Sequence, residues 1–208
     1  MSNRFFSFIL MTALFAVMFL SCKKDDKEFV VSGTISGEHA NWTEVAVSFD
    51  EGETWAKTAP ISNGKFRMKL PIPAAHYLIP LEIEEYPDKI DVSDKNAKVG
   101  STTFSVRKDD QIEILMLRDP NILPLFGAGV GASYIYADRN VNVSGSVDEK
   151  DERSGISFKW EVDQKLKKGW NTVVVTSSGF QSGTWITTSK TDNVPSNLVW
   201  VAIGAYEN

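Results

Sequence analysis

The chain has 208 residues, of which 42% are hydrophobic and 24% are charged, and its formal net charge is −5 at pH 7. This acidic balance argues against nucleic acid as a partner, because phosphate binding needs clustered lysine and arginine. The sequence contains one cysteine, so no intrachain disulfide can hold the fold. Stability has to come from a hydrophobic core, and the roughly 180 residues after the N-terminal segment are enough for one or two domains.

The N-terminal segment has the composition of a signal peptide. An apolar stretch occupies residues 5–20, and only Ser7 and Thr12 interrupt it. As a helix this stretch would span about 24 Å, which is shorter than the roughly 30 Å hydrocarbon layer of a bilayer. We therefore expect residues 1–21 to be a cleaved signal peptide, with an uncleaved signal anchor as the alternative.

Cys22 follows the sequence Phe-Leu-Ser at the end of this stretch and precedes Lys23, Lys24, Asp25 and Asp26. A cysteine in this place resembles the lipobox of bacterial lipoproteins, in which the thiol receives a diacylglyceryl group and becomes the mature N-terminus. The charged residues that follow resemble the export signal of Bacteroidota-type surface lipoproteins. These resemblances imply a lipid on Cys22 and a position on the outer membrane that faces the cell exterior. Two alternatives stay open: a secretory peptide with an incidental cysteine, and a charged tether on a periplasmic protein.

Downstream of the tether, hydrophobic residues alternate with period two, and the 3.6-residue period of amphipathic helices is absent. Short alternating segments separated by Gly, Pro and Asn are typical of β-sandwiches. We therefore expect an all-β protein built from one or two packed β-sandwich modules. The predicted strands are 29–35, 44–49, 54–58, 65–70, 77–83, 102–106, 111–117, 134–137, 141–147, 156–162, 171–176, 184–188 and 198–203.

Three segments of the first half carry a resemblance to known sandwich modules. They are Val-Ser-Gly-Thr-Ile at 31–35, Val-Ala-Val-Ser at 45–48 and Asn-Gly-Lys-Phe-Arg-Met-Lys-Leu-Pro at 63–71. Their order, with a glycine-containing first strand, a hairpin and a Gly-Lys-Phe strand that ends in proline, is similar to that of transthyretin-like and carboxypeptidase-regulatory-like domains. The resemblance implies a sandwich that serves as a spacer or binding platform and has no catalytic activity of its own.

We expect five regions along the chain. They are a signal peptide at 1–21, a lipidated charged tether at 22–28, a transthyretin-like sandwich at 29–119, an apolar Gly/Pro connector at 120–133 and a second β module at 134–208. The connector is rich in apolar residues, so we expect it to pack between the modules and to limit hinge motion. The segments Tyr-Ile-Tyr-Ala-Asp at 134–138 and Lys-Lys-Gly-Trp-Asn at 167–171 of the second module resemble parts of Bacteroidota-type lipoproteins of unknown function.

The sharpest motif of the first half consists of Ser48, Asp50, Gly52, Thr54 and Trp55. It resembles the Asp-box of sialidases and related β-propellers. We expect a structural hairpin, in which Gly52 adopts positive φ, Asp50 accepts hydrogen bonds from the turn and Trp55 packs beneath it. The chain has one copy and is too short for a six-bladed propeller, so the motif does not predict sialidase activity.

Residues with catalytic or metal-binding potential are few. The two histidines, His39 and His76, do not have a zinc-ligand spacing. Glu82 and Glu84 share one face of a predicted strand, where a solvated surface is the favoured interpretation over a glycosidase pair. The acidic turn at 148–153 lacks the order of a calcium loop. We predict no catalytic residue, no metal site and no cofactor.

The aromatic residues fall into two groups. Phe158 and Trp160 share a strand face, and Trp200 lies in an apolar strand, so we expect these three side chains in the core. Trp185 follows a polar, glycine-containing segment that also holds Phe180. We expect these two rings to be a candidate ligand contact, with ordinary core packing as the alternative.

Three functions remain open on this basis. The favoured one is a non-catalytic surface lipoprotein, a binding or accessory module for a glycan, a peptide or a partner protein. The second is a fimbrial subunit of transthyretin-like type, in which an edge strand is exchanged between subunits. The third and weakest is a glycan-active enzyme, because no paired titratable groups stand out.

Overall fold

The computed structural model describes residues 28–37, 42–81, 89–109, 111–120, 128–151, 155–181 and 184–203. These residues form fifteen β-strands and a short 3₁₀ turn, η2, at Ala75–Tyr77, and this part of the chain contains no α-helix. The all-β fold predicted from the alternating pattern is therefore confirmed. All fifteen strands belong to one hydrogen-bonded network.

The strands follow one another closely along the chain. They are β1 (Val30–Ser36), β2 (Glu44–Ser48), β3 (Trp55–Pro60), β4 (Lys65–Lys69), β5 (Ile79–Pro80), β6 (Ile90–Val92), β7 (Lys98–Ser101), β8 (Thr103–Lys108), β9 (Gln111–Arg118), β10 (Gly129–Ala137), β11 (Val141–Lys150), β12 (Ser157–Leu166), β13 (Gly169–Gln181), β14 (Thr184–Thr191) and β15 (Val199–Ile203).

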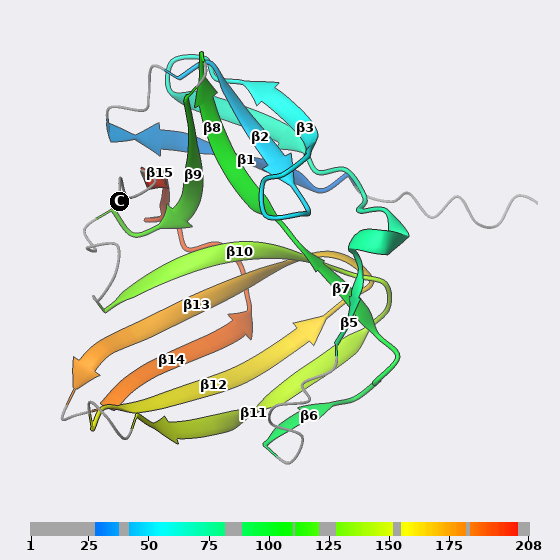
Figure 1. Cartoon of the computed structure of the whole chain (residues 1–208), viewed down its shortest axis with the longest axis vertical. Helices are drawn as coiled ribbons and strands as arrows, with labels where there is room; N and C mark the ends of the chain where they lie inside the picture. The colour runs from blue at the N-terminus through cyan, green and yellow to red at the C-terminus, as the bar shows by residue number, and fades with distance from the viewer. Residues whose placement is uncertain are drawn as a thin grey trace, which may run out of the picture.

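The upper part of Figure 1 is a sheet that curves around the largest core. Its strand order is β3-β2-β8-β9-β15-β1-β4, in which β15 is parallel to β1 and antiparallel to β9. Trp200 on β15 is 2% exposed and belongs to this core, as predicted. Its ring centroid lies 5.3 Å from that of Phe66 and 4.8 Å from that of Phe104, so the core is built around aromatic contacts.

The lower part of Figure 1 is a six-stranded sheet with the order β10-β13-β14-β12-β11-β6. Its pairs are antiparallel except for β12 and β14, which run parallel. Part of one face is covered by Leu81, next to β5, and by Ala97, between β6 and β7. Ile90 shares a buried cluster with Val162, and Ala97 shares another with Leu166.

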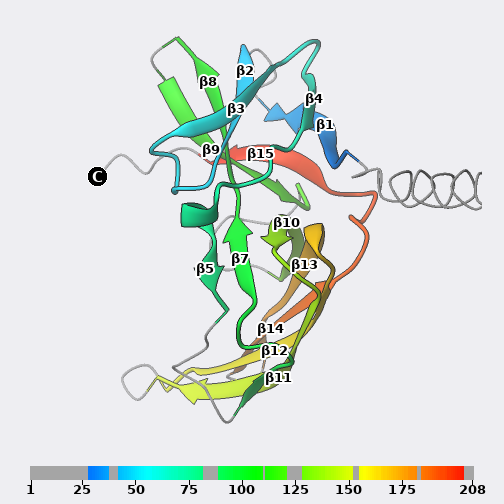
Figure 2. The ribbon, with the colours of Figure 1, turned by 90° about the vertical axis from the view of Figure 1, so that its right-hand side faces the viewer.

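Strand β10 joins the two parts. Near its start, Gly131 and Ala132 pair with β9, and near its end the strand pairs with β7. Its other edge pairs with β13 along its whole length. Figure 2 shows the result from the side: the six-stranded sheet bends away below β9 and β15.

Two features of this arrangement differ from the expected division of the chain. Strand β10 begins at Gly129, so the last five residues of the expected connector at 120–133 are part of the sheet. Strand β15 comes from the expected second module, 134–208, but lies between β1 and β9 of the first. Glycines suggested a loop in the first case, yet hydrogen bonds on both edges hold these residues as a strand.

Local differences concern the middle of the chain. The segment 77–83 was expected to be one strand, but it begins in η2 and continues as the two-residue β5. Pro80 lacks the N–H group that would extend the ladder, which limits pairing there. Strands β6 and β7 were not predicted, because segments of three and four residues show no clear alternation.

Candidate functional site

A groove of about 640 Å³ lies where β9 and the end of the β7–β8 connection face the six-stranded sheet. One wall is the outer face of β9, which contributes Ile114 and Met116. Leu115 and Leu117 of the same strand are buried in the large core, so alternation turns Ile114 and Met116 outward, where each is 49% exposed. An apolar wall therefore faces the solvent.

The floor of the groove is made by small residues of β10. Gly129, Gly131 and Ser133 share one face of this strand and line the groove. Strands are paired with both edges of β10, so a side chain at Gly129 or Gly131 can only leave the sheet through one of its faces. On the face that lines the groove, a larger side chain would project into the groove. The hydroxyl of Ser133 is a polar group on an otherwise apolar floor.

The far wall comes from β13 and β14. Val175 and Ser177 of β13 line the groove together with Trp185 and Thr187 of β14. Ser177 and Thr187 are direct partners in the antiparallel ladder, which places their hydroxyls on the same face. The predicted ligand contact Trp185 therefore lies in a groove of the molecule.

The aromatic surface continues beyond the groove onto β12. Phe158 is the direct partner of Trp185 in the parallel ladder, so both rings lie on one face, and Trp160 follows two residues later on that face. Phe158 is 45% exposed and Trp160 is 49% exposed. The expectation that these two side chains belong to the core is wrong. Val162, on the same face, is buried in a cluster with Ile90, and this cluster does not extend to Phe158 and Trp160.

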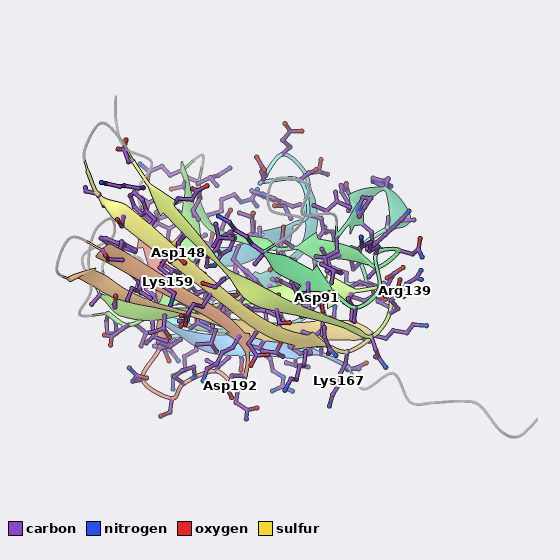
Figure 3. The ribbon with its side chains drawn as sticks, turned by 90° about the horizontal axis from the view of Figure 1, so that it is seen from below. Asp91, Arg139, Asp148, Lys159, Lys167 and Asp192 are labelled. Atoms are coloured by element: carbon purple, nitrogen blue, oxygen red, sulfur yellow. The ribbon has the colours of Figure 1, made fainter. Side chains whose placement is uncertain are left out.

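The opposite face of the sheet has a different character. Asp148 and Lys159 are cross-strand partners on β11 and β12, and Figure 3 shows both among the charged side chains of this sheet. Glu161 and Asp148 raise the pKa of Lys159, and the larger cause is the hydrogen bond that the Lys159 ammonium donates to the Glu161 carboxylate. Charged residues thus alternate with the rings of Phe158 and Trp160 along β12. One face of the sheet is aromatic and the other is charged.

Arg118 is the single charged side chain that lines the groove in the described part of the chain. Its Nε atom is buried and has no hydrogen-bond acceptor among the described residues. A buried donor of this kind costs free energy unless a ligand or water accepts its hydrogen bond. The groove thus combines apolar walls, several hydroxyls and one unpartnered donor.

The predicted Asp-box forms the hairpin between β2 and β3. The carboxylate of Asp50 accepts a hydrogen bond from the backbone N–H of Thr54 at 2.9 Å, and this bond lowers the pKa of Asp50. Gly52 has a φ of 101°. Trp55 lies beneath the guanidinium of Arg107, 4.7 Å from its ring centroid.

Ser48 and the other residues of this hairpin do not line the groove, so the structure separates the motif from the candidate site. Phe180 pairs with Trp185 across β13 and β14, and its side chain lies outside the described part of the structure. Cys22, Lys23, Lys24, Asp25 and Asp26 also lie outside it.

Sequence reasoning missed the β9 wall and the glycine floor. A signal was present in β9, where Ile114, Leu115, Met116 and Leu117 are apolar without alternation. Such a run predicts a strand with two apolar faces, of which only one can face the large core. Among the described residues, no three His, Cys, Asp or Glu side chains gather as metal ligands would. No described helix has the length and apolar character needed to cross a membrane.

No protein-family model matches this sequence, and neither the curated proteins nor the solved structures contain a significant match.

Proposed function

We propose that the protein is a non-catalytic binding protein, held by a lipid on Cys22 at the outer membrane and facing the cell exterior, whose groove binds a neutral glycan. The observation that carries this proposal is the set of three rings, Trp185, Phe158 and Trp160, on one face of β12 and β14 beside the groove. Two of them are nearly half exposed, although large aromatic side chains are mostly buried.

A glycan fits this surface chemically. The C–H face of a sugar ring is apolar and can stack on an indole, while its hydroxyls need hydrogen-bond partners at the edge. The groove offers Trp185 for stacking and Ser133, Ser177 and Thr187 as donors and acceptors. Arg118 Nε adds a donor that has no acceptor among the described residues. Ligand sites in general combine mostly apolar walls with a few placed polar groups.

The lining also supports a neutral ligand and a binding role. Arg118 provides the one charge among the lining residues, so a strongly charged ligand would lose its hydration without full compensation. Glycoside hydrolysis uses a pair of carboxylates that flank the scissile bond, and the described lining contains no Asp or Glu.

The test uses the full-length lipidated protein in phospholipid vesicles and a panel of neutral oligosaccharides that includes α- and β-linked glucans, xylans and mannans. We expect one class to bind, measured by calorimetry, and the Trp185→Ala variant to weaken that binding by at least about tenfold. Trp55→Ala is the matched control, because this tryptophan packs on Arg107 away from the groove. Equal binding by the wild-type protein and Trp185→Ala, or no binding to any member of the panel, would contradict the proposal.

The anchor is tested separately. We expect Cys22→Ala to release the protein from membranes into the soluble fraction, because stable attachment depends on the acyl chains. Thermal unfolding of the released protein provides the control that the variant is folded. Attachment that survives in Cys22→Ala would show that another part of the chain holds the membrane.

A further inference from the structure

Two isoleucines stand out on the surface at some distance from the groove. Ile72 is 64% exposed and Ile79 is 63% exposed, the highest values among the large hydrophobic side chains of the described residues. They belong to one short segment, which leaves β4, passes through η2 and ends in β5. Neither residue lines the groove, so the proposed ligand site does not explain their exposure.

This segment begins beside the point where the chain enters the fold. Val30, the first residue of β1, pairs with Lys69, and the N–H of Leu70 donates to the carbonyl of Phe29 at 2.9 Å. Ile72 follows two residues later. In Figure 1 the start of β1 and η2 both lie at the right-hand side of the molecule. Cys22 is six residues before Glu28, and six residues of fully extended chain reach at most about 22 Å.

A cluster of half-buried rings adjoins the same place. The ring of Trp170 lies 6.2 Å from that of Phe29, 6.1 Å from that of Phe49 and 5.4 Å from that of Tyr136. Tyr77, in η2, lies 5.6 Å from Phe49. The rings of Tyr77 and Tyr136 are amphipathic, and such rings are enriched at the boundary between lipid and water, where one side is apolar and the other is wet.

Lysines flank the patch. Lys98 pairs with Pro80 next to Ile79, and Lys69, at the end of β4, forms an ion pair with Glu28 at 2.5 Å. Long basic side chains beside an apolar patch can reach lipid phosphates while their methylene groups stay in contact with the acyl region. Exposed apolar side chains, tyrosine rings and a neighbouring lysine together suit a membrane surface.

The small size of the patch favours a bilayer over a protein partner. A stable protein partner needs about 800 Å² on each side, which two isoleucines cannot supply. A bilayer that already holds the lipid of Cys22 is present at high effective concentration, so a small apolar contact is sufficient.

We infer that Ile72, Ile79 and the adjacent ring cluster rest in the interface of the bilayer that holds the Cys22 lipid, and that this contact points the groove away from the membrane. The inference rests on the proposed lipid anchor. Strand β10 connects the two ends of the molecule: Gly129 lines the groove, and Ala137 pairs with β7 near the patch. Nine residues of strand separate these ends by about 27 Å.

The test places a fluorescent reporter on the patch. The lipidated chain has no other thiol, so Ile79→Cys can be labelled with an environment-sensitive nitrobenzoxadiazole dye and studied in vesicles of phosphatidylethanolamine and phosphatidylglycerol. Ile112→Cys is the matched control, because Ile112 is 52% exposed and lies on β9 outside the groove. We expect lipid-borne spin labels to quench the dye at residue 79 several times more strongly than the dye at residue 112.

Equal quenching at the two positions, on a protein that stays attached to the vesicles, would overturn the inference and leave the anchor intact. The wild-type chain treated with the same dye is the second control. If it becomes labelled, Cys22 carries a free thiol, and both the anchor and the inference are overturned. A pair of serine substitutions, Ile72→Ser with Ile79→Ser, extends the test: we expect attachment through Cys22 to persist while the dye at a third position, Tyr77→Cys, loses most of its quenching.

Discussion

The indole of Trp200 lies directly against the backbone of Gly33. A Cβ atom on this glycine would lie 2.4 Å from Cδ1 and 2.5 Å from Nε1 of Trp200, which is closer than atoms can approach. The ring has little room to move, because Trp200 is 2% exposed and contacts Phe66 and Phe104. Glycine at position 33 therefore permits β15 to close the large core.

We expect Gly33→Ala to lower the free energy of unfolding by about 1–3 kcal/mol, because the added methyl group overpacks a filled core. Urea denaturation measures this change. Ser32→Ala is the control, since Ser32 is exposed on the same strand. Equal stability of the two variants would show that the core can accommodate the methyl group.

Tyr134 links stability to alkaline pH. The residue is 6% exposed, and burial raises the pKa of its phenol to about 12. An unfolded tyrosine has a pKa of about 10, so between these values the unfolded state loses a proton that the folded state keeps. The contribution of Tyr134 to stability is then constant below about pH 10 and falls above it, by at most about 1.4 kcal/mol per pH unit.

The comparison with Tyr134→Phe isolates this contribution from those of the other tyrosines and the lysines. We expect the stability of the wild-type protein, measured by urea denaturation, to fall more steeply above about pH 10 than that of Tyr134→Phe. Parallel pH profiles for the two proteins would mean that the phenol ionises as readily in the folded state as in the unfolded state.

Alternation in the sequence predicted which residues share a face, but it could not predict how far that face is covered. Phe158, Trp160 and Val162 alternate as core residues do, yet only Val162 is buried. The cover comes from Ile90 and its neighbours on β6, a three-residue strand more than 60 residues earlier. The extent of such a cover depends on the path of a distant segment, which the local pattern of β12 does not contain.

The sequence predicted one residue of the groove correctly but did not predict its floor. Trp185 was predicted as a ligand contact because of the polar, glycine-containing segment before it, and it does line the groove. The glycines at 129 and 131 suggested a connector, because their conformational freedom is typical of loops. Pairing with β9 and β13 turns them into a strand, and the missing side chains then leave space where two sheets meet.

The Asp-box hairpin predicts a pH effect at the acidic end. The Thr54 N–H holds the pKa of the Asp50 carboxyl below its usual range, so the folded state favours the charged form. Such a group stabilises the fold above its unfolded pKa, and the contribution is lost as pH falls through its folded pKa. We expect Asp50→Asn to be less stable than the wild-type protein near neutral pH, and the difference to shrink as the pH falls below about 4. A difference that is independent of pH would contradict a role for the charge.

Gly52→Ala tests the turn of the same hairpin. A φ of 101° is poorly accessible to alanine, so we expect the substitution to lower the free energy of unfolding by about 1–2 kcal/mol. Thermal or urea unfolding measures the change. Thr58→Ala, an exposed position on β3, controls for general effects on the hairpin. If both variants unfold alike, the turn can adopt a second conformation.

The floor of the groove offers the most direct way to separate ligand binding from folding. A Cβ atom at Gly131 would lie 3.4 Å from the carbonyl oxygen of Leu117, an ordinary contact, so a side chain is tolerated there. Its outer atoms would enter the groove beside Trp185. In the series Gly131→Ala, Gly131→Val and Gly131→Leu, we expect glycan affinity to fall progressively, by about tenfold or more for leucine, while the unfolding free energy stays within about 1 kcal/mol. Affinity that stays constant across the series would show that the ligand does not reach the floor, and a matching loss of stability would show that the residue serves the fold.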